Sequence, residues 1–310
     1  MLHHVLNIAD FTKSDLNEIL TVANHIADHS SLYETVAKGK ILATLFFEPS
    51  TRTRLSFESA MWRLGGNVVG FSDMSTSATA KGETIEDTAA MVCCYCDVMV
   101  VRHPTAFTPH RMSEVSTVPV INAGDGANEH PTQTLTDLLT VYRRFGRLDN
   151  LTLGLCGDLK YGRTVHSLIK MLARYPGNRF VLIAPDELQM PGEILELLDK
   201  DNVPYEQIAS LDDAMPELDI LYMTRIQRER FADPAQYAKL KGVYVLDMEK
   251  MQHAKQEMIV MHPLPRVDEI AEAVDRDPRA WYFKQAQFGV YVRMALIIAL
   301  LDLPHFAEGE

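Results

Sequence analysis

Short apolar runs alternate with amphipathic stretches along most of the chain, and this alternation restricts the fold more than any other feature. The runs at 41–47, 97–101 and 151–156 have the length and composition of buried strands. The stretches at 12–29 and 131–145 carry apolar residues at helical spacing. Repeated strand–helix units produce a mostly parallel sheet that is covered by helices. The sequence therefore predicts an α/β fold.

The same pattern continues to the end of the chain. A helix is expected after Ser50. Further strands are expected at 67–71, 118–123, 180–184, 219–223 and 258–261. Further helices are expected at 84–94, 164–175, 193–199 and 281–301. The 310 residues are enough for two domains, and a second α/β series starts near Asp149. We expect helix 131–145 to connect the domains. Helix 281–301 is apolar around much of its circumference, so we expect it to be largely buried.

The composition argues against several classes of protein. With 47% hydrophobic and 23% charged residues, the chain is typical of a globular protein. No apolar run approaches the length of a membrane span, and the first residues lack the pattern of a signal peptide. A formal net charge of −12 argues against general binding of nucleic acid. We therefore expect no nucleic-acid or membrane partner, and local clusters of arginine become more informative in so acidic a chain.

The chain has four cysteines, and Cys93, Cys94 and Cys96 lie in one short segment, well before Cys156. A structural metal site needs a second group of ligands at regular spacing, and the sequence has none. Buried free thiols in a reducing cytoplasm are the favoured interpretation. The expected location is therefore cytoplasmic.

Five polar residues, Ser50–Arg54, follow the strand at 41–47 and begin the next helix. The free N–H groups at a helix N-terminus carry partial positive charge and favour anions. A capped helix with surface arginines is the alternative interpretation. We favour a phosphate or another anion, because five polar residues in a row exceed what a helix cap needs.

Arg102 and His130 also fall just after expected strands. Ligands of parallel α/β sheets bind beyond the carboxyl ends of the strands, so Arg52, Arg102 and His130 can converge there. A lone His130 before Pro131 would more often be a residue at a helix start than a catalytic one. The convergence of all three is the stronger argument for a site.

Arg163 and Arg225 follow strands of the second half. Each guanidinium can bind one carboxylate through two parallel hydrogen bonds, and salt bridges between domains are the other interpretation. The segment 157–162 lacks the close glycine pair of a dinucleotide fingerprint, and the chain has no phosphate-binding loop ending in Gly-Lys-Ser/Thr. Together the two halves predict a cleft that brings an acyl or phosphoryl donor against an acceptor carrying carboxylates.

Several motifs resemble the aspartate/ornithine carbamoyltransferase family, over nearly the whole chain from about residue 6 to residue 302. The segments that carry this resemblance are Ser50–Arg54, Arg102–Pro104, His130–Gln133 and His262–Arg266. Two more segments, 157–163 and 223–230, resemble the members of the family that use aspartate. The Ser-Met-Gly and His-Cys-Leu-Pro segments expected of the members that use ornithine are not present in this sequence.

The resemblance implies two doubly wound domains, each a mostly parallel sheet flanked by helices. Residues 1–131, completed by a returning C-terminal helix at 288–310, would bind carbamoyl phosphate, and residues 132–287 would bind aspartate. The implied reaction moves the carbamoyl group of carbamoyl phosphate to the amino group of L-aspartate. Its products are N-carbamoyl-L-aspartate, a precursor of pyrimidines, and phosphate. It needs neither a metal nor an organic cofactor.

The resemblance also implies roles for individual residues. Those expected to bind carbamoyl phosphate are Ser50, Thr51, Arg52, Thr53, Ser77, Lys81, Arg102, His130 and Gln133. Among them Arg52, Thr53, Arg102 and His130 form the expected catalytic set, and the last three would polarise the carbonyl oxygen. Those expected to bind aspartate are Lys81, Arg163, Arg225, Gln227 and Leu264. Bridges that hold a closed state are expected from Glu48, Glu229 and Arg230.

Ser77 and Lys81 would come from a neighbouring subunit, which implies a homotrimer with active sites between its subunits. The family often has two lysines here, whereas Ala80 precedes Lys81 in this chain, so one positive charge is missing. The segment 105–111 departs from the Gly-Ala-Ala pattern of the family, in a region that contacts a regulatory chain in some relatives. A larger assembly with a regulatory chain therefore stays open.

Two other functions also stay open. One is a carbamoyltransferase with a different acceptor, although the segment 222–230 favours a dicarboxylate. The other is a catalytically weak scaffold, which should have lost residues of the phosphate or carbonyl site, yet Arg52, Arg102, His130 and Gln133 are all present. His130 could serve as a base, but its position favours a role as a donor to the carbonyl oxygen.

Overall fold

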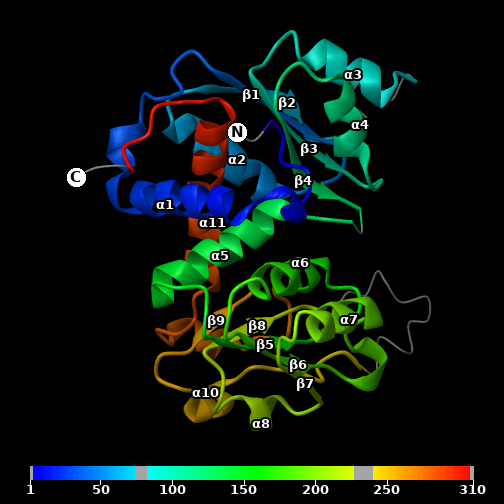
Figure 1. Ribbon diagram of the computed structural model, residues 1–310, viewed down its shortest axis with the longest axis vertical. Coiled ribbons are helices and arrows are strands. Elements are labelled where there is room, and N and C mark those ends of the chain that lie inside the picture. The colour runs from blue at the N-terminus through cyan, green and yellow to red at the C-terminus, as the bar shows by residue number, and fades with distance from the viewer. Residues whose placement is uncertain (1–2, 74–81, 127, 227–239, 308–310) are drawn as a thin grey trace. The chain divides into compact units, whose positions relative to one another are not determined.

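The computed structural model describes residues 3–73, 82–126, 128–226 and 240–307. The chain packs into two units, Met1–Leu139 with Gln287–Glu310, and Thr140–Ala286. It leaves the first unit within helix α5 (Pro131–Phe145) and returns to it within α11 (Tyr282–Leu300) (Figure 1). The boundaries expected from the sequence, 131/132 and 287/288, fall inside the same two helices.

The first unit is built on a parallel sheet whose strands stand in the order β2-β1-β3-β4. Their bounds are Ile41–Phe46 for β1, Asn67–Phe71 for β2, Val98–His103 for β3 and Val120–Asp125 for β4. In register, Phe46 lies opposite Arg102, and His103 lies opposite Asp125. The carboxyl ends of β1, β3 and β4 are therefore neighbours along one edge of the sheet.

Helices cover both faces of this sheet (Figure 1). In chain order they are η1 (Ile8–Asp10), α1 (Lys13–His29), η2 (Ser30–Tyr33), α2 (Thr51–Arg63), α3 (Ile85–Val92) and α4 (Thr108–Val115). Alternate residues of β1 and β3, such as Leu45 and Val101, form one apolar cluster with Ala89 of α3 and Met112 of α4. The two-residue period of the strands thus decides which side chains reach these helices.

The second unit contains a five-stranded parallel sheet in the order β7-β6-β5-β8-β9. Its strands are β5 (Thr152–Cys156), β6 (Arg179–Ile183), β7 (Tyr205–Ile208), β8 (Ile220–Met223) and β9 (Ile259–Met261). Cys156 lies opposite Met223, and Tyr222 lies opposite Met261. The carboxyl ends of β5, β8 and β9 are again neighbours.

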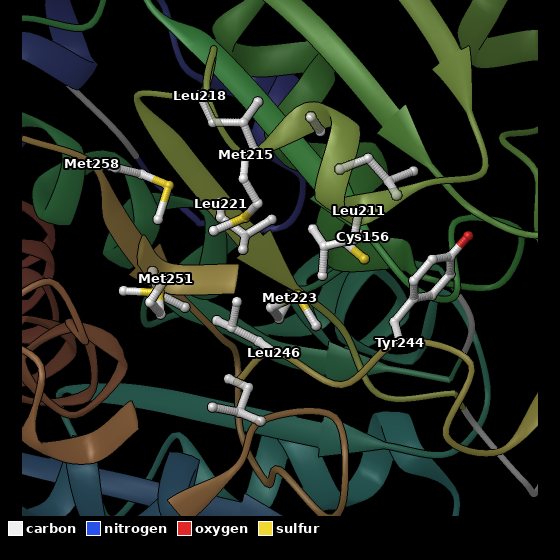
Figure 2. Packing of buried hydrophobic residues seen from close by; sticks show 14 of the residues in the cluster. Cys156, Leu211, Met215, Leu218, Leu221, Met223, Tyr244, Leu246, Met251 and Met258 are labelled. Atoms are coloured by element: carbon white, nitrogen blue, oxygen red, sulfur yellow. The ribbon is translucent and has the colours of Figure 1, made fainter. Parts of the chain in front are cut away.

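The helices of the second unit are α6 (Arg163–Leu172), η5 (Asp186–Leu188), α7 (Gly192–Lys200), α8 (Leu211–Ala214), α10 (Met248–His253) and η7 (Glu272–Arg276). One buried cluster against its sheet is rich in sulfur and includes Cys156, Met215 and Met223 (Figure 2). Burial raises the pKa of the Cys156 thiol. The prediction of a buried free thiol is confirmed at this residue.

The cysteine prediction is wrong for Cys94, which is exposed, and Cys93 and Cys96 are only partly buried. Helix α3 ends at Val92, so Cys94 lies in the turn that follows rather than on the packed face of the helix. Cys94 Sγ donates to the carbonyl oxygen of Ala90 at 3.7 Å.

The elements that the sequence pattern did not predict are short and polar. Strand β7 is the edge of its sheet and presents exposed polar residues, and α4 buries few apolar side chains, chiefly Met112. Strand β3 extends two residues beyond the expected end, so Arg102 lies within the strand instead of after it. Within the described residues, no helix has both the length and the apolar character needed to cross a membrane.

Gly157 is a position where only glycine fits. Its φ is +118°, and a Cβ added there would lie 2.6 Å from Thr224 Oγ1 and closer still to the Thr224 carbonyl oxygen. We expect Gly157→Ala to lower the free energy of unfolding by about 2–4 kcal/mol, because strain and clash add. Gly242 provides the matched control, since its φ is +75° with no atom within 4 Å of the added Cβ. Gly242→Ala should cost about 1 kcal/mol.

Urea unfolding of both variants measures the difference. Equal losses for Gly157→Ala and Gly242→Ala would show that the close approach to Thr224 is not what requires glycine.

Candidate functional site: two polar strand edges

The first polar edge begins where β1 leads into α2. Ser50 is the N-cap residue of α2, but its side chain makes no capping hydrogen bond. Thr51 and Arg52 are exposed, and Thr53 is only 9% exposed. The first N–H groups of a helix have no partner within the helix and, with the helix dipole, favour a bound anion. This turn therefore has the features of an anion site as well as those of a helix start.

Arg54 has a different role from its neighbours. Its Nε lies 2.6 Å from Glu58 Oε1, in an ion pair one helical turn apart, and Thr44 Oγ1 donates to the same carboxylate oxygen at 3.2 Å. Arg54 thus ties α2 to β1 through Glu58 and belongs to the scaffold beneath the turn.

Arg102 extends from the end of β3 and is held by two contacts. Its Nη2 lies 2.7 Å from Glu48 Oε1, and its Nη1 donates to the carbonyl oxygen of Ala123 at 3.3 Å. Its buried Nε has no hydrogen-bond partner among the described residues. Glu48, expected in bridges of a closed state, here pairs with Arg102, so an anion that binds this guanidinium competes with the carboxylate.

His130 follows β4 at the end of a loop that is organised by Asp125. This fully buried carboxylate accepts hydrogen bonds from Asn122 Nδ2, Asn128 Nδ2 and the backbone N–H groups of Phe107 and Glu129. Asp125 was not among the residues expected in the site, although an acidic residue between Gly124 and Gly126 at a strand end is a recognisable turn signal. The network fixes the approach to His130, which is 8% exposed.

Gln133 lies in the first turn of α5. Its Nε2 donates to Asp137 Oδ1 at 2.8 Å, one turn further along the helix. An ionised carboxylate only accepts hydrogen bonds, so this contact identifies the amide nitrogen and orients the amide oxygen away from Asp137. That oxygen can accept a hydrogen bond from an amino group.

The second polar edge lies on the other sheet, where β5 and β8 end side by side. Thr224 Oγ1 donates to the carbonyl oxygen of Cys156 at 3.0 Å and accepts from the N–H of Asp158 at 2.9 Å. These bonds fix the loops after both strands. Arg163 is the first residue of α6, and Arg225 follows Thr224, so both partly buried arginines belong to the same edge.

Leu264 belongs to the third loop of this edge, after β9. Its N–H donates to His262 Nδ1 at 2.7 Å, which leaves His262 Nε2 to donate to Glu269 Oε1 at 2.6 Å. Leu264 has a left-handed backbone, with φ of 54°, and precedes a cis proline. The buried pair of His262 and Glu269 therefore holds the carbonyl groups of this loop in place.

Five residues expected in the site lie outside the described part of the chain. They are Ser77, Lys81, Gln227, Glu229 and Arg230. The other expected residues fall into two groups, one on each sheet. The first group offers cationic and N–H donors suited to a phosphate and a carbonyl oxygen, and the second offers two arginines suited to carboxylates.

The fold and these two edges are those of an α/β protein of two units whose strand ends carry donors suited to anionic groups. In comparisons with known proteins, both halves of the chain match models of one family. Residues 3–143 match the family model "Aspartate/ornithine carbamoyltransferase, carbamoyl-P binding domain", and residues 149–300 match "Aspartate/ornithine carbamoyltransferase, Asp/Orn binding domain". The chain belongs to the aspartate/ornithine carbamoyltransferase family.

Individual relatives are similar over almost their whole length. The aspartate carbamoyltransferase catalytic subunit of Lachnoclostridium phytofermentans is 54% identical, with 97% of this chain and 99% of the relative covered. That of Clostridium perfringens is 56% identical, with 96% and 97% covered. The crystal structure of the M. jannaschii aspartate transcarbamoylase catalytic subunit is similar with a TM-score of 0.92, 46% identity, and 97% and 98% covered. The Trypanosoma cruzi enzyme with carbamoyl phosphate and aspartate has a TM-score of 0.89 at 40% identity, with 96% of each chain covered.

The loop under Leu264 depends on the ionised form of Glu269. Burial alone raises the pKa of this carboxyl, but the hydrogen bonds from His262 and from backbone N–H groups hold the pKa below its ordinary value of 4.5. Because the pKa is lower in the folded chain, the carboxylate stabilises the fold above about pH 4.5, and this contribution is lost as the pH falls further.

We expect Glu269→Gln to lower the free energy of unfolding by about 1–3 kcal/mol at neutral pH and to flatten its decline in acid. Glu257→Gln is the control, because the Glu257 side chain is 75% exposed and its ion pair with Arg144 should contribute about 0–1 kcal/mol. Urea unfolding between about pH 7 and pH 4 measures both. A Glu269→Gln chain with the acid dependence of the parent would contradict this account.

Proposed function

We propose that this chain is an aspartate carbamoyltransferase, which transfers the carbamoyl group of carbamoyl phosphate to the amino group of L-aspartate. The products are N-carbamoyl-L-aspartate and phosphate, in the route to pyrimidines. The observation that carries the proposal is the similarity over almost the whole chain, at 54–56% identity, to catalytic subunits that bear this name. The two polar edges described above fit the two substrates chemically.

We assign carbamoyl phosphate to the residues of the first unit. Its phosphate binds the helix N-terminus at Ser50–Thr53 together with Arg52 and Arg102, since these provide N–H, hydroxyl and guanidinium donors to an anion. The carbonyl oxygen accepts from Thr53, Arg102 and His130. The carbamoyl amino group donates to the amide oxygen of Gln133, whose nitrogen is engaged by Asp137.

Aspartate is assigned to the residues of the second unit. Arg163 and Arg225 each bind one carboxylate, and Gln227 and the carbonyl group of Leu264 complete its site. Arginine suits this role because its planar group donates two parallel hydrogen bonds to a carboxylate. The same geometry disfavours ornithine, which carries a cationic side chain in place of the second carboxylate.

The reaction is an attack of the neutral α-amino group on the carbonyl carbon. Negative charge grows on the carbonyl oxygen and on the departing phosphate, and each fixed donor aimed at this charge is worth about 10²–10³ in rate. An α-amino group is mostly protonated at physiological pH, and the carboxylates of free aspartate favour this form further, so the amino group must lose a proton before it attacks. The departing phosphate accepts the proton, so His130 acts as a donor to the carbonyl oxygen and no separate base is required.

The assembly follows from the family resemblance. We propose a homotrimer in which Ser77 and Lys81 act in the site of a neighbouring subunit, with Glu48, Glu229 and Arg230 in the bridges of a closed state. The relatives are named catalytic subunits, which supports an oligomer. A regulatory chain and a cytoplasmic location are parts of the proposal that rest on the resemblance and on the free cysteines of the sequence.

The proposal is tested most directly by which amino acid the chain carbamoylates. With carbamoyl phosphate, we expect turnover of L-aspartate and none of ornithine, measured as carbamoylated product. Arg225→Gln should raise the KM for aspartate by about 10- to 150-fold, because a hydrogen-bonded ion pair is lost, with little change in the KM for carbamoyl phosphate.

Arg147→Gln is the matched control, since it removes the same charge from an exposed arginine of the second unit whose nearest carboxylate contact, to Asp149, is 4.0 Å long. Turnover of another amino acid but not of aspartate would contradict the proposal and support a carbamoyltransferase with a different acceptor. A chain without turnover on any acceptor would support the scaffold reading.

The shared site is tested by mixing chains. Lys81→Ala and Arg52→Ala chains should each be inactive alone. After dissociation and reassembly of an equal mixture, about one quarter of the sites combine an intact Arg52 with a neighbour's intact Lys81, so activity should return. Mixtures of Arg52→Ala and Arg102→Ala chains should stay inactive, because both changes fall in the same chain's half of the site. Absence of recovery in the first mixture would contradict the contribution of Lys81 in trans.

A further inference from the structure

A buried arginine of the first unit is not used by the proposed chemistry. Arg293, on α11, is 5% exposed, and none of the ion pairs among the described residues includes it at short range. Its Nη1 donates to the carbonyl oxygen of Gly289 at 2.9 Å, its guanidinium lies 4.9 Å above the Phe57 ring, and its Nε has no hydrogen-bond partner among the described residues. A guanidinium so incompletely satisfied is costly to bury, so its position calls for a reason beyond packing.

The remaining contact of Arg293 leads to the site. Its Nη2 donates to Thr132 Oγ1 at 3.3 Å, and the same hydroxyl oxygen lies 3.4 Å from His130 Nδ1. Thr132 is fully buried, and His130 nearly so. A continuous path of polar contacts therefore runs from the guanidinium through one hydroxyl group to the imidazole ring.

The direction of the hydrogen bonds along this path follows from the chemistry of the groups. A guanidinium only donates, so Thr132 Oγ1 must accept from Arg293. A hydroxyl group that accepts from a cation becomes a better donor and a poorer acceptor, because neighbouring hydrogen bonds polarise each other. The Thr132 hydroxyl group therefore donates its hydrogen bond to His130 Nδ1. A neutral ring that accepts at Nδ1 carries its own proton on Nε2.

We propose that Arg293 is a positioning residue that acts through Thr132 to hold His130 as the Nε2–H tautomer. This tautomer presents a donor on the side of the ring away from Thr132, which is what a carbonyl oxygen bearing growing negative charge requires. The consequence for catalysis rests on the proposed function, whereas the tautomer itself is a property of the protein without substrate.

A second contact supports the same role. Asp137, which orients the amide of Gln133, lies close enough to Arg293 for the two charges to interact. Burial lowers the pKa of Arg293 to about 10, and the charge of Asp137 opposes this shift, so the group stays protonated at neutral pH. Arg293 is thus linked to two residues that are assigned to the carbamoyl group, His130 just before α5 and Gln133 in its first turn.

The test uses Thr132→Val, which removes the hydroxyl group and keeps the shape of the side chain. In the full-length protein labelled with ¹⁵N-histidine, the ring signals of His130 are assigned by their loss in His130→Asn. We expect the parent chain without substrate to show the Nε2–H pattern at a pH where the ring is neutral. Thr132→Val and Arg293→Met should each increase the Nδ1–H population, and Thr132→Ser should restore the parent pattern.

Thr134→Val is the matched control. Thr134 is fully buried two residues away on α5, and its hydroxyl group has no hydrogen-bond partner among the described residues. Its loss should leave the His130 spectrum unchanged. With aspartate as acceptor, kcat should fall by about 10- to 100-fold in Thr132→Val with little change in KM, and not in Thr132→Ser or Thr134→Val.

An Nδ1–H ring in the parent chain, or a Thr132→Val spectrum identical to that of the parent, would overturn the proposal. The spectra also separate this inference from the proposed function. The expected tautomer pattern in a chain that does not carbamoylate aspartate would support the positioning role and contradict only the enzymatic assignment.

Discussion

Parallel strand pairing is the constraint on which the rest of this structure depends. The pairing of β1 with β3 and of β3 with β4 sets the carboxyl ends of three strands next to each other. Ser50, Arg102 and His130 stand at or just after those ends, although they are far apart in the chain. The second sheet repeats the arrangement with β5, β8 and β9, which brings the loops of Arg163, Arg225 and Leu264 to one edge. Each polar edge is therefore a product of sheet order.

Buried polar groups then hold these edges rigid. Asp125 organises the loop before His130, Thr224 joins the loops after β5 and β8, and Glu269 supports Leu264 through His262. Such groups are costly to bury unless their hydrogen bonds are made, and once made the bonds fix one geometry. Preorganised donors stabilise developing charge without rearrangement, so in the proposed function these supporting groups matter as much as the residues assigned to the substrates.

Much of the site could be predicted from the sequence, because its residues stand at strand ends and helix starts, which periodicity locates well. Local patterns could not show what each side chain contacts. Arg54 and Arg52 look alike in the sequence, yet Arg54 pairs with Glu58 one helical turn away. Glu48 was expected in bridges of a closed state, and its contact with Arg102 could not be read from the sequence. Asp125 and Arg293 were not selected. The glycines around Asp125 indicate a turn but not the four hydrogen bonds that its carboxylate accepts, and an arginine in an apolar helix has no local signature of its contacts.

The sequence by itself determined the α/β class, most of the helices and strands, and the chemical character of the two edges. These depend on short-range periodicity and on the residue types at element ends. Only the tertiary structure decided the order of the strands, the short polar elements β7 and α4, the exposure of Cys94, and the path from Arg293 through Thr132 to His130. Arg293 and Thr132 are distant in the chain, and their contact exists only because α11 packs against α5 within the first unit. Contacts of that kind are set by the packing of whole elements, which no local pattern records.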